Sequence, residues 1–440
     1  MLSISITGLS FVKVALLATG EMHQMAGLET RFPKYELISS GKNVDRIPEL
    51  HELREKTPIA WVPVMDAAFL TRHADIVRVL KDHRMAPANL TQGIRLLSPE
   101  QQEELEPLSS AVKKWMGHTV PADHQRFIGL LKRYFTPAMI DRMRPRVRQL
   151  SHELLDAVEP AGRMDIVSDI AYPLPACVIA EMLGVPMDNR AQLLAWSADI
   201  GAIAEIVSYD RLMECQRSLL AMQDFVLEVV KERRAEPKDD LISMFVAAER
   251  EGLVSEAEIL SNCVMLLFSG HETTGGLITS GLVQLFDHPD QLELLKSDPD
   301  LMPGAVEEML RLAGPASVIS RVSTEPVEVA GHQFEAGQQF LLALMAGNRD
   351  PRVFEDPDRL DATRRPNDHL AFATGMFYCL GAALARMEAD EFFRILLDRF
   401  PDVSPGYETP DWQPVLLISR RLKTLPVNLR GVGGSGAGDE

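Results

Sequence analysis

A helical pattern of about thirty residues near the middle of the chain constrains the fold more than any other feature of the sequence. It begins at Ser255 and Glu258, which form a capping-box signature. It runs to about Phe286, where the segment DHPD ends it. A helix of this length at ~1.5 Å per residue extends for roughly 45–50 Å. The chain therefore needs a fold in which one helix can cross an entire domain.

The centre of this helix, LLFSGHETTGG, contains the glycines Gly270, Gly275 and Gly276. Each glycine costs about 1 kcal/mol relative to alanine in a helix interior. Either something approaches the backbone there, or the helix is locally opened. Close packing between helices would be a sufficient explanation for the glycines alone. Glu272 and Thr273 lie beside them, and a carboxylate in such a helix centre needs a reason.

The remaining patterns predict a mainly helical (α+β) fold with small β-sheets. Helical patterns dominate from about residue 100 to about residue 315. Between about 318 and 345, apolar residues alternate around the turn glycines Gly331 and Gly337, which predicts a hairpin. Helix returns after Cys379, and PVLLISRRLKTLPVNL predicts closing strands.

The chain is expected to form one large domain, over residues 31–430, because no linker rich in Gly, Ser or Pro divides its interior. Residues 1–30 are predicted to be an N-terminal arm. Their apolar run is interrupted by Gly8 and Lys13 and is shorter than the ~20 apolar residues that span a bilayer. No stable membrane insertion is expected. The segment 431–440, GVGGSGAGDE, predicts a disordered tail.

Charge and cysteine content narrow the class of function. The formal net charge of -18 over 440 residues argues against nucleic acid or an anionic membrane as a partner, because both select basic surfaces. None of the four cysteines belongs to a C-x-x-C pair, so neither a disulfide framework nor a cysteine zinc site is indicated. A cytoplasmic location is predicted.

Cys379 has the most unusual surroundings of the four cysteines. It lies between Gly375 and Gly381 and directly before a helical pattern, with aromatic residues around it. A helix N-terminus stabilises a thiolate, and glycines let the backbone turn and approach a flat ligand closely. Cys379 has three interpretations: a structural cysteine, a nucleophile, or a thiolate that binds a metal. A cysteine thiolate is one known haem ligand. No histidine closer than His369 is available as a base for a nucleophile.

The loop FATGMFYCLGAALARME resembles the cysteine-ligand loop of the cytochrome P450 family, whose core is F-x-x-G-x-x-x-C-x-G. The core positions fall on Phe372, Gly375, Cys379 and Gly381. The resemblance runs from roughly residue 60 to residue 427. It implies the family's mainly helical fold, with the long helix over a haem b group that Cys379 binds through its iron.

Other family motifs follow in the expected order. SGHETT resembles the oxygen-side helix motif, in which Glu272 and Thr273 would be the acid–alcohol pair that relays protons and hydrogen-bonds dioxygen. EEMLR resembles the E-x-x-R motif, with Glu308 and Arg311, and DPDRL supplies Arg359 as the expected third member of a buried salt-bridge cluster.

The resemblance also implies partners for the haem propionates, and here the sequence departs from the family. His124 and Arg321 match propionate-binding positions. Phe377 stands where the family usually has His or Arg, and Ile128 stands where it usually has Arg. Ala373 stands where glycine is commoner. Two charge-assisted donors, each worth about 1.5–3 kcal/mol, are therefore missing.

The implied activity is that of a monooxygenase, which inserts one atom of O2 into an apolar small molecule such as a polyketide or terpenoid. Use of peroxide, rearrangement chemistry and non-catalytic haem binding are the alternatives. Ferredoxin and an NAD(P)H-dependent ferredoxin reductase are the expected partners, with basic docking candidates at Lys113, Lys114, Arg126, Lys132 and Arg133. Substrate-pocket residues are predicted at Ser269, Val318, Ile319, Leu416 and Leu417.

Overall fold

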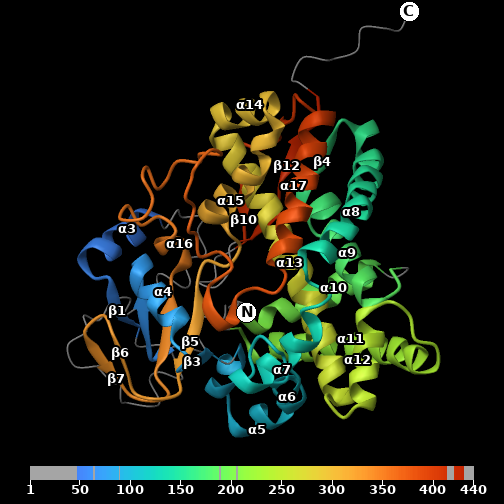
Figure 1. Cartoon of the computed structure of the whole chain (residues 1–440), viewed down its shortest axis with the longest axis vertical. Helices are drawn as coiled ribbons and strands as arrows, with labels where there is room; N and C mark the ends of the chain where they lie inside the picture. Colours follow the sequence, from blue (N-terminus) through green and yellow to red (C-terminus); the bar gives the residue numbers. More distant parts are fainter. Residues whose placement is uncertain are drawn as a thin grey trace, which may run out of the picture.

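The computed structural model describes residues 47–62, 65–88, 90–187, 190–204, 207–413 and 421–430 (Figure 1). The predicted arm (1–30) and tail (431–440) lie outside these residues. Among the described helices, none is both long enough and apolar enough to cross a membrane. The α-helices are α3 (Ile47–Lys56), α4 (His73–Lys81), α5 (Pro99–Glu104), α6 (Glu106–Lys113), α7 (Pro121–Leu131), α8 (Pro137–Val158), α9 (Pro173–Leu183), α10 (Arg190–Ile200), α11 (Tyr209–Ala235), α12 (Leu241–Arg250), α13 (Glu256–Asp287), α14 (Pro289–Ser297), α15 (Met302–Ala313), α16 (Leu344–Gly347) and α17 (Ala382–Arg399).

The strands form small sheets beside this helical body. The largest has the order β1-β2-β8-β5-β3, in which β2 and β8 are parallel and the other neighbours antiparallel. The strands are β1 (Ile59–Val62), β2 (Ala67–Leu70), β3 (Met85–Pro87), β4 (Arg163–Asp165), β5 (Ile319–Ser323), β6 (Val327–Val329), β7 (His332–Phe334), β8 (Gln339–Leu342), β9 (Ser404–Pro405), β10 (Asp411–Trp412), β11 (Leu422–Thr424) and β12 (Pro426–Asn428). The prediction of a mainly helical fold with small sheets is confirmed.

The hairpin predicted around Gly331 is also confirmed. β6 and β7 pair antiparallel, with Val327 opposite Phe334. Ala330 and Gly331 connect them with φ of +50° and +83°, which is the left-handed backbone that two-residue hairpin turns require.

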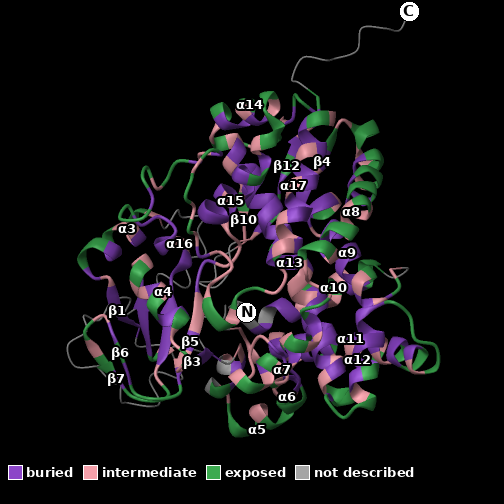
Figure 2. Ribbon diagram, viewed as in Figure 1, coloured by how far each residue is buried: buried purple, intermediate pink, exposed green. Residues whose placement is uncertain are grey.

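Helix α13 crosses the centre of the molecule, as predicted (Figure 1). Its capping box is present, since the Ser255 hydroxyl accepts from the Glu258 N–H and the Glu258 carboxylate accepts from the Ser255 N–H. Its N-terminal half packs into one buried apolar cluster with α11 and α12, and its C-terminal half into a second cluster with α9, α15 and α17. Figure 2 shows buried residues along α11, α12, α15 and α17. The segment with the glycines therefore lies where the two cores meet.

The glycines of α13 are explained by close packing, and the idea that the helix is locally opened is wrong. The helix is continuous through them. A Cβ on Gly275 would lie 2.7 Å from the carbonyl oxygen of Ala171, and one on Gly276 would lie 2.8 Å from the Pro315 side chain. Gly270 packs against its neighbours in the same way. Neighbouring segments thus approach α13 more closely than any larger residue would permit.

Candidate active site

Cys379 lies at the end of a short loop that leads directly into α17. The loop contains a single 3-10 turn, η7 (Gly375–Phe377), and the Cys379 N–H closes it by donating to the Phe372 carbonyl at 3.1 Å. Gly375 has a φ of +80°, and a Cβ there would lie 2.5 Å from the carbonyl oxygen of Leu80. The loop therefore needs glycine at this position on both grounds.

The thiol of Cys379 can be reached from a cavity, whereas Cys177, Cys215 and Cys263 are buried. Burial raises the pKa of Cys379, while the N–H groups of Gly381 and Ala382 at the start of α17 act in the opposite direction. The predicted contribution of the helix start is thus present but smaller than the effect of burial. A bound cation would displace the thiol proton.

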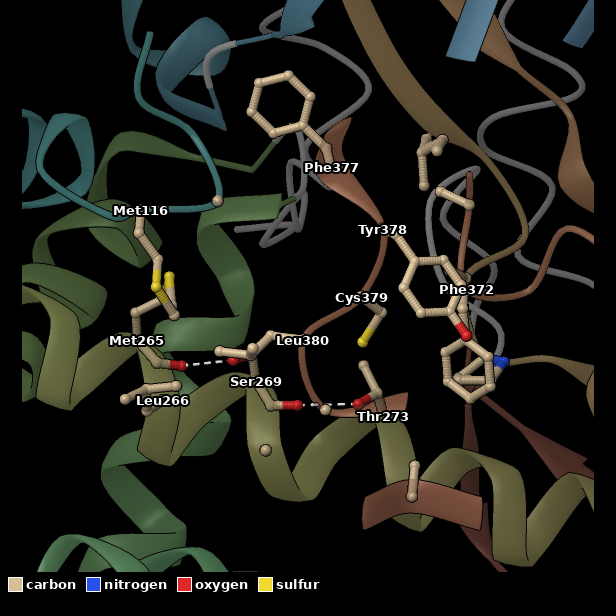
Figure 3. A pocket seen from close by; sticks show the side chains of 18 of the residues that line it. Met116, Met265, Leu266, Ser269, Thr273, Phe372, Phe377, Tyr378, Cys379 and Leu380 are labelled. Carbon is tan, nitrogen blue, oxygen red and sulfur yellow. Dashed lines mark hydrogen bonds between the residues drawn. The ribbon is translucent and has the colours of Figure 1, made fainter. Parts of the chain in front are cut away.

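The cavity beside Cys379 has a volume of about 410 Å³ and lies between the cysteine loop and α13 (Figure 3). Its walls are mainly apolar. From the side of α13, Ser269 and Thr273 line it, and both hydroxyls are fixed by the preceding turn of the helix. The Thr273 hydroxyl donates to the Ser269 carbonyl at 2.8 Å, and the Ser269 hydroxyl donates to the Met265 carbonyl at 2.6 Å. Cys379 on the loop and Thr273 on α13 therefore line the same cavity.

The predicted substrate-pocket residues divide into three groups. Ser269 and Ile319 line the cavity. Val318 does not, because its side chain packs in a separate apolar cluster with residues of α3 and β8, so this part of the prediction is wrong. Val318 directly precedes β5, and Ile319 is its first residue. Successive residues of an extended backbone point to opposite faces, which explains the difference. Leu416 and Leu417 lie outside the described residues.

Glu272, the acid of the predicted pair, is not part of the cavity wall. Its carboxylate forms an ion pair with Arg421 at 2.6 Å, and the two side chains are only 9% and 12% exposed. Tyr172 lies nearby, where burial and then the charge of Glu272 raise its pKa to about 12. Sequence analysis missed Arg421, because nothing near Arg421 in the sequence relates it to a helix 149 residues earlier.

Glu308 and Arg311 form the expected buried pair on α15, with 2.6 Å between Glu308 Oε1 and Arg311 Nε. The predicted third member, Arg359, is wrong. Its side chain is 60% exposed and pairs with Asp290 at 3.1 Å. Arg364 occupies the place instead, with its Nε 3.1 Å from Glu308 Oε1 and its side chain 10% exposed. The Asp361 N–H donates to the Glu308 carboxylate at 3.0 Å, which brings the segment after Arg359, and with it Arg364, to the cluster.

This cluster fixes the segment that leads to the cysteine loop. Arg311 donates to the carbonyls of Asn348 at 3.0 Å and Arg359 at 2.9 Å. Asn367 donates to Glu308 at 3.0 Å. The buried charges thus hold parts of the segment 348–367 against α15.

His124 and Arg321 lie together at one end of the cavity, around Phe377. The His124 ring centroid is 4.4 Å from that of Phe377, and the Arg321 guanidinium is 5.5 Å from the Phe377 centroid. The His124 nitrogens contact the carbonyl oxygens of Met116 at 2.8 Å and Met376 at 3.2 Å. The structure therefore brings the two predicted propionate-binding residues to one place.

Arg321 is buried, and burial lowers its pKa to about 10. Its Nη1 donates to the Ser320 carbonyl at 2.9 Å. No carboxylate in the described ranges forms an ion pair with it. A buried guanidinium without a counter-ion is unfavourable, so this end of the cavity is suited to an anion.

Glu388 on α17 is a buried acid that the sequence analysis did not single out. Its side chain is beside Thr274, which lines the cavity, and its Oε2 has no hydrogen-bond partner within the described part of the chain. Burial raises the pKa of Glu388 to about 8. Its spacing of four residues from the apolar, buried Leu384 and Phe392 is the signal that could have revealed it.

Comparison with known proteins decides the family. The model of the cytochrome P450 family matches residues 37–423. The chain is 38% identical over 379 residues to cytochrome P450 CYP107DY1 of Priestia megaterium, which covers 84% of this chain and 89% of that relative. The chain belongs to the cytochrome P450 family. It is also 35% identical to the 6-deoxyerythronolide B hydroxylase of Saccharopolyspora erythraea, over 90% of this P450 and 99% of the hydroxylase.

Solved P450 structures share the fold. P450BioI, in complex with an acyl carrier protein ligated to hexadec-9Z-enoic acid, superposes with a TM-score of 0.81 at 33% identity and covers 87% of this chain and 98% of its own. CxnD, an enzyme for C–S bond formation in chuangxinmycin biosynthesis, gives a TM-score of 0.82 at 30% identity, with 93% and 99% covered. The predicted P450 fold is confirmed, and the chain is an oxidoreductase of the P450 monooxygenase class.

A P450 carries a haem iron, and the residues of this site fit that group. Cys379 offers one thiol ligand to the cavity, which suits a metal that arrives with its own ring. A Cβ on Gly381 would enter open space, and the buried indole nitrogen of Trp115, which lines the cavity, has no hydrogen-bond partner in the described ranges. The thiol of Cys379 and the buried cation of Arg321 match a flat metal complex with carboxylate arms.

Proposed function

We propose that this P450 binds haem b through Cys379 and inserts one oxygen atom of O2 into a C–H or C=C bond of an apolar small molecule. The observation that carries the proposal is that the Cys379 thiol and the Thr273 side chain line the same apolar cavity, one from the cysteine loop and the other from α13 (Figure 3). Haem bound by a thiolate supplies the activation of O2 and the cleavage of the O–O bond. The protein orients the substrate and excludes water.

The chain itself handles the protons. The Thr273 oxygen keeps lone pairs that can accept from the cavity while its proton is donated to Ser269. Glu272 is the carboxylate next to it on α13, and its ion pair with Arg421 holds it behind the cavity wall. Proton delivery through Glu272 therefore requires that this pair open or that a water connect Glu272 with Thr273.

The substrate is proposed to be a bacterial secondary metabolite, such as a polyketide or a terpenoid. The apolar walls of the cavity suit such a molecule because they gain by excluding water. Two relatives support this class, the 6-deoxyerythronolide B hydroxylase and the polyketide biosynthesis cytochrome P450 PksS of Bacillus subtilis, which is 34% identical.

The proposed electron donors are a ferredoxin and its NAD(P)H-dependent reductase, in the cytoplasm. The contact between His124 and the Met376 carbonyl places α7 against the cysteine loop. Among the predicted docking residues, Arg126 is neutralised by Glu258 at 2.6 Å, and Lys114 is held by Ser110 at 2.8 Å. The exposed side chains of Lys113, Lys132 and Arg133 are left as docking candidates.

The test is turnover of a panel of polyketides and terpenoids with ferredoxin, reductase and NADPH, compared with turnover driven by hydrogen peroxide. The proposal expects product with the electron-transfer chain, and the Thr273→Ala variant should consume NADPH with much less product. A double charge reversal, Lys132→Glu and Arg133→Glu, should weaken ferredoxin-supported turnover and reduce its dependence on salt. Product formation with hydrogen peroxide, and none with ferredoxin, reductase and NADPH, would contradict the proposal.

A further inference from the structure

The cavity end that holds His124 and Arg321 lacks two donors that the resemblance led us to expect. Phe377 and Ile128 occupy their positions, and neither side chain can donate a hydrogen bond to a carboxylate. Phe377 instead packs its ring against His124 and under the Arg321 guanidinium. It orders these two donors but does not add one.

His124 alone cannot make up the difference, because both of its ring nitrogens already face carbonyl oxygens, at 2.8 and 3.2 Å. A neutral imidazole has one N–H, so even one of these contacts uses its only donor. Arg321 is therefore the main donor at this end that has hydrogens to spare.

His118 is a further polar side chain that lines the same cavity. It lies between α6 and α7, with its ring centroid 6.3 Å from that of Trp115, whose indole nitrogen is unpartnered within the described residues. The Nδ1 of His118 is 3.4 Å from the Ala88 carbonyl oxygen, and no residue in the described ranges hydrogen-bonds its Nε2. Burial, with a smaller contribution from Arg321, lowers the pKa of His118 to about 4. Pro87, the residue before Ala88, pairs with Arg321 across β3 and β5, so the Ala88 contact places His118 near Arg321.

We propose that His118 replaces the missing donors and, together with Arg321, binds a carboxylate arm of the haem. A carboxylate beside the ring favours its protonated form. The protonated ring then keeps the Ala88 contact through Nδ1 and donates to the carboxylate through Nε2. The haem carboxylate would thus be a counter-ion for Arg321, which has no ion pair among the described residues, and an acceptor for the His118 Nε2. The inference rests on the proposed haem-thiolate function.

The test is the rate at which the holoenzyme loses haem to apomyoglobin. His118→Leu should lose haem faster by on the order of tenfold, as expected for one hydrogen bond to a charged group. His118→Gln, which keeps a donor, should lie between this variant and the wild type. His83→Leu is the matched control, since the His83 side chain is 82% exposed, and its rate should equal that of the wild type.

Haem dimethyl ester, which lacks free carboxylates, separates the proposed contact from general packing. With the ester, wild type and His118→Leu should lose the cofactor at the same rate, because the partner of His118 is gone. Equal rates with ordinary haem, or a faster loss in His118→Leu that persists with the ester, would overturn the inference. The carbon monoxide spectrum of the same samples reports thiolate ligation separately, so the proposed function can stand where this inference fails.

Discussion

Replacing Glu388 by glutamine should stabilise the protein at neutral and alkaline pH, by an amount that grows with pH. Burial raises the pKa of this carboxyl from 4.5 to about 8 in the folded protein. In the unfolded chain it ionises near its ordinary value. Between the two pKa values the folded state holds one proton more than the unfolded state. The unfolding free energy of the wild type therefore falls as pH rises through this range.

The magnitude follows from the size of the rise. A difference of one in pKa corresponds to about 1.4 kcal/mol, so the rise from 4.5 to about 8 corresponds to roughly 5 kcal/mol lost across that range. Glutamine cannot ionise. Relative to the wild type, Glu388→Gln should gain about 4 kcal/mol between about pH 5 and about pH 8, with little further change above that.

The assay is urea unfolding of the holoenzyme as a function of pH. Asp398→Asn serves as the control, because it removes an exposed acid from the same helix. Its unfolding free energy should change with pH in the same way as that of the wild type. If the Glu388→Gln profile also runs parallel to the wild type, Glu388 is ionised in the folded state and the argument from burial is refuted.

Three further experiments test other parts of the structure. Ala373 has a φ of +57°, which strains an L-residue by about 1–2 kcal/mol. Ala373→Gly should therefore raise the unfolding free energy by about 1 kcal/mol. A lower midpoint in thermal unfolding would contradict this backbone conformation. Arg364→Gln should lower the unfolding free energy by about 3 kcal/mol and Arg359→Gln by less than about 1 kcal/mol. The reason is that Arg364, unlike Arg359, is buried against Glu308. Equal losses would support Arg359 as the third member of the cluster. A double-mutant cycle of Arg421→Gln and Glu272→Gln should give a coupling energy of about 1–3 kcal/mol, and a value near zero would mean that the pair does not form in solution.

The features that could be predicted from the sequence depend on neighbouring residues. Three such features are the cap at Ser255, the apolar periodicity of α13 and the turn at Gly331. Each is specified by residues that are close together in the sequence. The cysteine loop has a fixed spacing from Phe372 to Gly381. Local hydrogen bonds and backbone preferences are sufficient to produce such features, so they can be read without knowing how the chain folds.

The features that could not be predicted depend on where distant segments meet. Arg364 replaces Arg359 because the segment after Arg359 reaches Glu308, through the Asp361 N–H and the Arg364 guanidinium. The partner of Glu272 comes from the C-terminal segment. Val318 and Ile319 are adjacent in sequence, yet they enter different apolar surroundings. Sequence periodicity does not reveal which buried surface a residue reaches.

The most direct test of the account is the absorbance spectrum of the dithionite-reduced protein with carbon monoxide, recorded for wild type, Cys379→Ala and Cys177→Ala. We expect the strongly red-shifted Soret band of a thiolate-ligated haem in the wild type and in Cys177→Ala, since Cys177 is buried away from the cavity. The band should be lost in Cys379→Ala. A wild-type band at the position of histidine-ligated haem, or an unchanged spectrum in Cys379→Ala, would contradict the assignment of Cys379 as the iron ligand.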